Sequence, residues 1–168
     1  MNATDHFTLL GLPRAFSVDP QVLEAAWKRV ATAVHPDRFA AGSAAEKRVA
    51  LQWSTQANEA WRVLKDPLSR ARYLCELSGV DLQVETNTAM APAFLMQQME
   101  WHEALEELAS HPNPDSYRVL TKQFDEARKG FVQTLTDVFE KQQFDQAAAH
   151  FFCWYLTEVA GRQAQTLE

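Results

Sequence analysis

The triplet His35-Pro36-Asp37 carries the clearest chemistry in the sequence. Pro36 disfavours the α conformation at His35, so the chain must leave a preceding helix there and enter a loop through Asp37, Arg38 and Phe39. In such a loop the Asp37 carboxylate projects into solvent, where it can accept a bidentate hydrogen bond from an arginine of another protein. The triplet therefore indicates a recognition turn, although a tripeptide alone also fits a simple helix-ending turn.

Three cations flank this triplet. Lys28, Arg29 and Arg38 lie on or beside the polar side of the preceding helix. Their charge can steer this part of the chain toward an acidic surface. For Lys28 and Arg29 an ordinary solvated helix face is the alternative.

Residues with the spacing of an enzyme site are sparse. His102 with Glu106, and Glu107 with His111, are spaced to share a helix face, but the Glu-x-x-His pairs of carboxylate-bridged metal sites are missing. The sequence also lacks a glycine-rich phosphate loop, a nucleophile elbow and a cysteine with an interpretable His/Asp context. We therefore expect no enzymatic activity, no metal and no cofactor. The two cysteines, Cys75 and Cys153, are expected to be buried free thiols.

The segments before and after the triplet repeat apolar residues at the spacing of an α-helix. A short helix at Asp5–Leu10 is expected to stop at Gly11-Leu12-Pro13, and Asp19-Pro20 starts the helix that runs to about His35. Ser43 and Glu46 form a capping box for the next helix. The expected core residues of these two long helices are Leu23, Trp27, Val30 and Val34, then Val49, Trp53, Ala57, Ala60 and Leu64. Asp66-Pro67 starts a further helix that ends at Gly79.

The second half of the chain predicts a separate helical module. Residues 80–91 lose the helical pattern and are interpreted as a linker between a first domain at 1–79 and a second at 92–168. Three helices are expected, from Pro92 to Ala109, from Pro114 to about Lys141 and from about Phe144 to Gly161. The middle helix repeats apolar residues every three or four positions, which suits an antiparallel three-helix bundle: Tyr117, Leu120, Phe124, Ala127, Phe131, Leu135 and Val138. The fold class is therefore all-α.

The first helix of this module carries two apolar faces. At about 100° per residue, Phe94, Trp101, Leu105 and Leu108 share one face that can bury against the other two helices. Leu95, Met96 and Met99 cluster on another side, bordered by Glu100 and Glu103, which gives an apolar patch with an acidic rim. This patch fits a partner-binding face. Packing against the first domain or a neighbouring chain, or complete burial of the helix, fits it equally well.

Composition is that of a globular protein with two unlike halves. Hydrophobic residues make up 46% and charged residues 23% of the 168 residues. Through Gly79 there are 10 Lys and Arg against 8 Asp and Glu, and after it 6 against 14, so a net charge of +2 is followed by −8. The acidic balance argues against nucleic-acid binding. No apolar run approaches the roughly 20 residues that span a bilayer, and the start MNATDHFTLL has no leader pattern, so a cytoplasmic location is expected.

The order and spacing of the first half resemble the J-domain. The likeness covers about Asp5 to Leu77: a short helix, two amphipathic helices around His35-Pro36-Asp37, and LKDPLSRARYL after them. The resemblance implies that the triplet engages a DnaK/HscA-type ATP-dependent chaperone and promotes its ATP hydrolysis. Lys28, Arg29 and Arg38 are expected to assist chaperone binding by steering this module toward an acidic surface.

The second half is similar to the HscB family of J-domain co-chaperones. The string AFLMQQMEWHEALEEL resembles the first client-side helix of that family, and the opening DHFTLLGLP, the short linker and the three-helix tail look like it as well. The absence of an amino-terminal pair of CxxC motifs resembles its bacterial members. The resemblance implies a co-chaperone that delivers an IscU-type iron–sulfur scaffold protein during cluster biogenesis; a J-domain co-chaperone for a different client is the alternative. It implies the client-binding residues Leu95, Met96, Met99, Glu100, Glu103 and Leu156.

Overall fold

All regular secondary structure in the part of the chain that the structure describes is helical. A computed structural model describes residues 4–82 and 90–168, which form α-helices and one 3₁₀ turn with no strand. The chain divides into two compact units, Met1–Leu74 and Cys75–Glu168. The all-α prediction is confirmed. The predicted linker at 80–91 lies largely outside the described residues, since 83–89 are not among them, and the domain boundaries stay predictions.

The helix bounds are α1 His6–Leu9, α2 Pro20–Ala33, η1 Pro36–Phe39, α3 Ala44–Lys65, α4 Pro67–Leu77, α5 Pro92–Ser110, α6 Pro114–Glu140 and α7 Phe144–Gln165.

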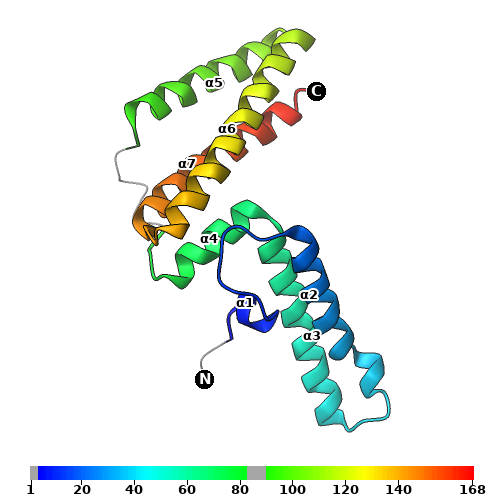
Figure 1. The fold of residues 1–168 in the computed structure, drawn as a ribbon. Coiled ribbons are helices and arrows are strands. Elements are labelled where there is room, and N and C mark those ends of the chain that lie inside the picture. The colour runs from blue at the N-terminus through cyan, green and yellow to red at the C-terminus, as the bar shows by residue number, and fades with distance from the viewer. Residues whose placement is uncertain (1–3, 83–89) are drawn as a thin grey trace. The chain divides into compact units, whose positions relative to one another are not determined.

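Local sequence signals fix where the helices of the first unit begin. The Asp19 side chain accepts a hydrogen bond from the Gln21 N–H at the start of α2. Ser43 and Glu46 form the expected capping box at the start of α3, in which each side chain binds the backbone N–H of the other residue. Such caps satisfy donors that a helix leaves unpaired in its first turn. Helices α2 and α3 then run antiparallel as a hairpin, with α1 packed against α3 (Figure 1).

The core of this hairpin differs from the prediction at two positions. Val49 and Trp53 were expected to face the core, and both are exposed. The other predicted core residues of α3, Ala57, Ala60 and Leu64, are buried, and Ala50 joins them. With 22 residues against 14, α3 is about 12 Å longer than α2, so the early turns of α3 have less helix to pack against.

A buried arginine ties α4 to the rest of the first unit. Arg70 donates from Nε to the Phe16 carbonyl and from Nη1 to the Leu64 carbonyl, each at 2.6 Å, and its guanidinium lies 5.3 Å from the centre of the Phe16 ring. Burial lowers the pKa of this guanidinium below its ordinary value, and the nearby Asp66 opposes that shift. These bonds satisfy a buried charge that would otherwise destabilise the fold.

Asp5 caps α1 and should make the first unit sensitive to acid. Its carboxylate accepts bonds from the Thr8 N–H at 3.0 Å and from Arg14 Nη2 at 2.8 Å. Partial burial raises the pKa of Asp5, but the bonds from Arg14 and Thr8 outweigh it and lower the pKa to about 2. A folded-state pKa below the unfolded one means that the charge stabilises the fold at neutral pH, and that this contribution is lost as the pH falls from about 5 to 2.

Asp5→Asn, which keeps a capping side chain, is expected to lower the free energy of unfolding by about 1 kcal/mol at pH 7 after allowance for solvent screening at the exposed Arg14. Urea unfolding followed by circular dichroism at pH 7 and pH 2 measures this. The difference from wild type should fall to a small fraction of its pH 7 value at pH 2, close to the folded-state pKa of Asp5, and a difference that stays undiminished there would contradict the assignment. The same exchange at the α2 cap, Asp19→Asn, is the matched control.

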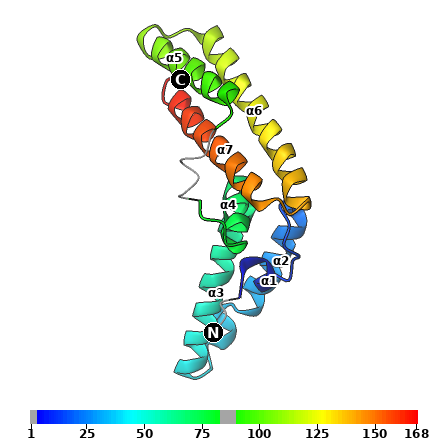
Figure 2. The same ribbon diagram turned by 90° about the vertical axis from the view of Figure 1, so that its left-hand side faces the viewer.

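The second unit is an antiparallel three-helix bundle. Helices α6 and α7 lie side by side, and α5 packs against both (Figures 1 and 2). One core cluster joins all three helices: Trp101, Leu105, Leu108, Leu120, Phe124 and Ala164. Helix α7 continues to Gln165 and not to the predicted end near Gly161, because Ala164 is buried in this cluster and holds the last turn in place.

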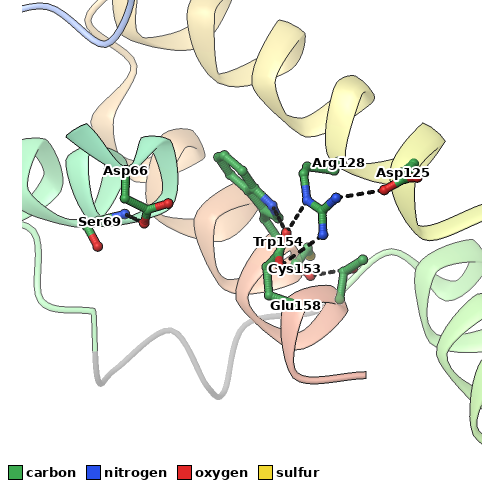
Figure 3. Close-up of polar contacts among 8 residues, drawn as sticks. Asp66, Ser69, Asp125, Arg128, Cys153, Trp154 and Glu158 are labelled. Atoms are coloured by element: carbon green, nitrogen blue, oxygen red, sulfur yellow. Dashed lines mark hydrogen bonds and ion pairs between the residues drawn. The ribbon is translucent and has the colours of Figure 1, made fainter. Parts of the chain in front are cut away.

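An ion-pair network joins α6 to α7 (Figure 3). Arg128 binds both carboxylate oxygens of Glu158 at 2.6 and 3.1 Å and reaches Asp125 at 2.8 Å. Trp154 donates its indole N–H to the same Glu158 carboxylate at 2.9 Å. Partial burial raises the pKa of Glu158, but the bonds from Arg128 and Trp154 outweigh it and keep the pKa below its usual value. Bidentate geometry of this kind fixes the register of two helices as well as their pairing.

Candidate functional site

The His35-Pro36-Asp37 triplet forms a single 3₁₀ turn at the end of α2. His35 has the extended conformation that Pro36 demands, with φ −60° and ψ 131°, and serves as the N-cap of η1. Its Nδ1 accepts a hydrogen bond from the Asp37 N–H at 3.2 Å, and its carbonyl accepts one from the Arg38 N–H at 3.0 Å. The expected loop is thus a defined turn, held by hydrogen bonds to the ring and the carbonyl of His35.

Both ionisable side chains of the turn face solvent. The side chain of Asp37 is 92% exposed and that of His35 57% exposed. Because Nδ1 accepts from the Asp37 N–H, the neutral His35 ring carries its hydrogen on Nε2. The turn therefore offers an outside protein one carboxylate acceptor and one imidazole donor, with their backbone already ordered.

A groove beside the turn gathers three of the predicted residues. Lys28, His35 and Arg38 line it together with Trp27, Ala31 and Thr32. Trp27 stacks on Trp61 with ring centres 5.1 Å apart and donates its indole N–H to Asn58 at 3.1 Å. The groove thus has an apolar floor and a cationic edge.

The other predicted cation lies elsewhere. Arg29 is exposed, and its guanidinium lies beside Gly11 and does not line the groove. Lys28 forms an i,i+4 ion pair with Glu24 at 2.7 Å. Sequence reasoning missed Trp27, Ala31 and Thr32 as groove residues. Ala31 lies four residues before His35, Thr32 four after Lys28 and Trp27 four before Ala31, and this helical spacing is the signal that could have found them.

The apolar patch on α5 faces outward within the second unit. Trp101, Leu105 and Leu108 are buried in the bundle core, as the core face predicts, whereas Leu95, Met96 and Met99 are 43%, 63% and 64% exposed. Complete burial of α5 is therefore excluded. Three large apolar side chains on one helix surface form a contiguous patch of the kind that marks protein-binding sites.

Part of this patch forms one wall of a groove between α5 and α7. Leu95 and Met99 line it from α5, and Leu156, Val159 and Ala160 line it from α7. Met96, Glu100 and Glu103 are exposed on α5 but do not line the groove. Further lining residues that sequence reasoning missed are Gln98, His102, Val159, Ala160 and Gln163. The spacing of 156, 159, 160 and 163 is a helical-face signal that could have revealed the α7 wall.

The histidine–glutamate pairs of the second unit are exposed contacts on single helices. His102 lies 3.3 Å from Glu106, and His111 lies 3.4 Å from Glu107. Across residues 4–82 and 90–168, no three His, Cys, Asp or Glu side chains are arranged to hold a metal ion. No helix in these two ranges combines the length and apolarity needed to cross a membrane.

An exposed His-Pro-Asp turn between two antiparallel helices, followed by a helical bundle, defines the class of J-domain co-chaperones. Residues 90–152 match the family described as the HSCB C-terminal oligomerisation domain. The chain is 52% identical over 164 residues to the co-chaperone protein HscB homolog of Bordetella pertussis, covering 97% of this chain and 95% of the relative. It is 45% identical to the homolog of Burkholderia multivorans at the same coverage. The chain belongs to the HscB family of co-chaperones.

Solved structures agree with this assignment. The structure resembles HscB from Vibrio cholerae with a TM-score of 0.81 and 27% identity, covering 97% of this chain and 96% of that one. It resembles human co-chaperone HscB with a TM-score of 0.88 and 26% identity, covering 99% of this chain and 83% of the human one. The predicted family and fold are confirmed.

Proposed function

We propose that this co-chaperone stimulates ATP hydrolysis by a DnaK/HscA-type chaperone and delivers an IscU-type iron–sulfur scaffold protein to it in the cytoplasm during cluster biogenesis. The observation that carries the proposal is the pairing, within one HscB-family chain, of an exposed His-Pro-Asp turn with an exposed apolar patch on a separate unit. The chain itself performs no chemistry. It regulates the ATPase of its partner and supplies that partner with a client.

The chaperone-binding residues of this proposal are His35, Pro36 and Asp37, with Lys28, Arg29 and Arg38 as accessory cations. The turn contributes directed hydrogen bonds, whereas exposed cations mainly accelerate encounter with an acidic surface. The position of Lys28 and Arg38 on the groove beside His35 supports a shared role for these two. Arg29, beside Gly11, would act through long-range charge alone.

The client-binding residues are Leu95, Met96, Met99, Glu100, Glu103 and Leu156. Methionine side chains are flexible and polarizable, which suits a surface that must adapt to a partner. The groove between α5 and α7 supports the inclusion of Leu156, because it places this side chain opposite Leu95 and Met99. The acidic residues at the edge favour a client with a basic rim around an apolar centre.

Calorimetric titration of a purified iron–sulfur scaffold protein into the full chain tests the client half of the proposal. We expect saturable one-to-one binding with a negative heat-capacity change, because apolar surface is buried. Absence of binding, together with intact stimulation of the chaperone, would identify a J-domain co-chaperone for a different client.

A further inference from the structure

Two methionines on α5 are open to solvent. Met96 is 63% and Met99 64% exposed, whereas Met90, just before the helix, is half-buried. Methionine is among the residues most often buried in proteins. Met96 and Met99 lie three residues apart on one helix, so their side chains are neighbours on its surface. The exposed thioethers of the second unit are therefore gathered on one apolar patch, beside Leu95.

The cysteines of the chain are better protected than these methionines. Cys75 is buried and Cys153 is half-buried. Burial raises the pKa of the Cys153 thiol, against a smaller opposing effect of a backbone hydrogen bond. Oxidation of a cysteine requires an accessible thiolate, so both thiols should react slowly. A thioether reacts without losing a proton, and its exposure decides its rate.

We propose that Met96 and Met99 form a reversible oxidation site for peroxides, at which the apolar patch of α5 becomes polar. A lone pair of the thioether sulfur attacks one oxygen of hydrogen peroxide, so that the S–O bond forms as the O–O bond breaks. The sulfur loses two electrons, and the proton of the transferred oxygen passes to the leaving hydroxide, which departs as water. A methionine sulfoxide reductase reverses the step with a dithiol, which becomes a disulfide while the oxygen leaves as water.

Oxidation at this site changes what the patch can bind. A sulfoxide oxygen is hydrated in water, and its burial against an apolar surface without a hydrogen-bond donor costs free energy. The acidic residues one turn farther along, Glu100 and Glu103, carry carboxylates that cannot donate a hydrogen bond to a sulfoxide. Met99 also lines the groove between α5 and α7 together with Leu156. Oxidation should therefore release the client, a consequence that rests on the proposed function.

Peptide mass spectrometry of the full chain after limiting hydrogen peroxide tests the order of oxidation. Met96 and Met99 should gain oxygen several times faster than Met90, and before either cysteine. A methionine sulfoxide reductase should then remove the added oxygen. Equal rates at all three methionines, earlier oxidation of a cysteine, or oxygen that the reductase cannot remove would overturn the proposal.

Calorimetric titration with the iron–sulfur scaffold protein, before and after peroxide, measures the consequence for the client. Oxidation of the wild-type chain should weaken binding at least about tenfold, equivalent to about 1.4 kcal/mol. The double variant Met96→Leu, Met99→Leu keeps apolar side chains without sulfur, so its own affinity should not change with peroxide. Met90→Leu, the matched control, should lose affinity on oxidation as wild type does. An equal loss in the double variant, or no loss in wild type, would overturn the proposal.

A measurement without the client separates this inference from the proposed function. In hydrophobic-interaction chromatography the oxidised wild-type chain should elute earlier than the untreated chain, whereas the double leucine variant should not shift. Unaltered elution of the oxidised wild-type chain would overturn the inference, whether or not the scaffold binds. If the untreated chain binds no scaffold but the oxidation order and the elution shift are as expected, the client proposal fails and the oxidation site stands.

The melting temperature of the oxidised chain shows whether the effect is local. It should match that of the untreated chain, because Met96 and Met99 are exposed and outside the bundle core. A sharp fall would show that oxidation acts by unfolding the second unit and would overturn the proposal.

Discussion

Asp37→Asn is expected to abolish stimulation of the chaperone's ATPase while leaving the fold intact. The Asp37 side chain is 92% exposed and has no core role, and its carboxylate, 3.6 Å from His35 Nδ1, remains open to a partner. Loss of one charge-assisted pair in a desolvated contact costs about 2–5 kcal/mol, which corresponds to at least a roughly 30-fold weaker coupling. Single-turnover hydrolysis of ATP by the chaperone, measured with each variant in excess, gives this number directly.

The fold of the Asp37→Asn variant needs a separate measurement. The Asp37 N–H, which bonds to His35 Nδ1, is unchanged by this substitution, so circular dichroism and the melting temperature should match wild type. His35→Gln should also lose stimulation, because it removes the imidazole and the acceptor that holds the turn. Stimulation by Asp37→Asn within twofold of wild type would contradict a role for the turn in chaperone binding.

The triple variant Leu95→Ala, Met96→Ala, Met99→Ala is expected to weaken binding of the iron–sulfur scaffold by at least about a hundredfold. Burial of each large apolar side chain against a partner is worth about 1.5–3 kcal/mol before costs, and each 1.4 kcal/mol is a factor of ten. All three are exposed within the second unit, so their truncation should leave its core intact. Calorimetric titration with the scaffold measures the change in affinity.

A matched control comes from the same unit. Val119 is exposed on α6 and does not line the groove between α5 and α7, so Val119→Ala should bind the scaffold as wild type does. Glu100→Ala and Glu103→Ala should each cost less than the triple variant, with effects that grow at low salt. If the melting temperature of the triple variant falls sharply while its affinity for the scaffold is unaltered, the patch is structural and the client-binding assignment is wrong.

Local signals in the sequence predicted the helices of this protein well. Asp19-Pro20 and the Ser43/Glu46 box act within one helical turn, so no distant residue is needed to read them. The same is true of Pro36, which ended α2 and shaped the turn at Asp37. The core face of α5 was also correct, because an apolar face of three-and-four spacing depends only on the helical period.

Predictions that depended on a neighbouring element were less accurate. Val49 and Trp53 have core spacing, but their burial depended on the reach of α2, which no local pattern shows. The buried Arg70 binds the Phe16 carbonyl 54 residues away, and no local sequence pattern near either residue predicts that contact. The last turn of α7 forms beyond Gly161 because Ala164 is buried in the bundle core.

The functional surfaces show the same division. The sequence predicted Leu95 and Met99 as residues left off the core face, and the structure places them outside the core. The wall that faces them, Leu156 with Val159 and Ala160, required the packing of α7 against α5. The exposed apolar residues of α5 could be predicted from the sequence of that helix alone, whereas the groove could be found only from the packing of α5 against α7.

In the proposed function, one chain couples a client to ATP hydrolysis by the chaperone. The most direct test is single-turnover ATP hydrolysis by the chaperone with the full-length chain, with the scaffold, and with both together. Tethering raises the local concentration of each partner for the other, so the two together are expected to stimulate hydrolysis well beyond the sum of their separate effects. This excess should be lost in both Asp37→Asn and the triple alanine variant. Stimulation by the chain and scaffold together that equals the sum of the two alone would contradict the coupling.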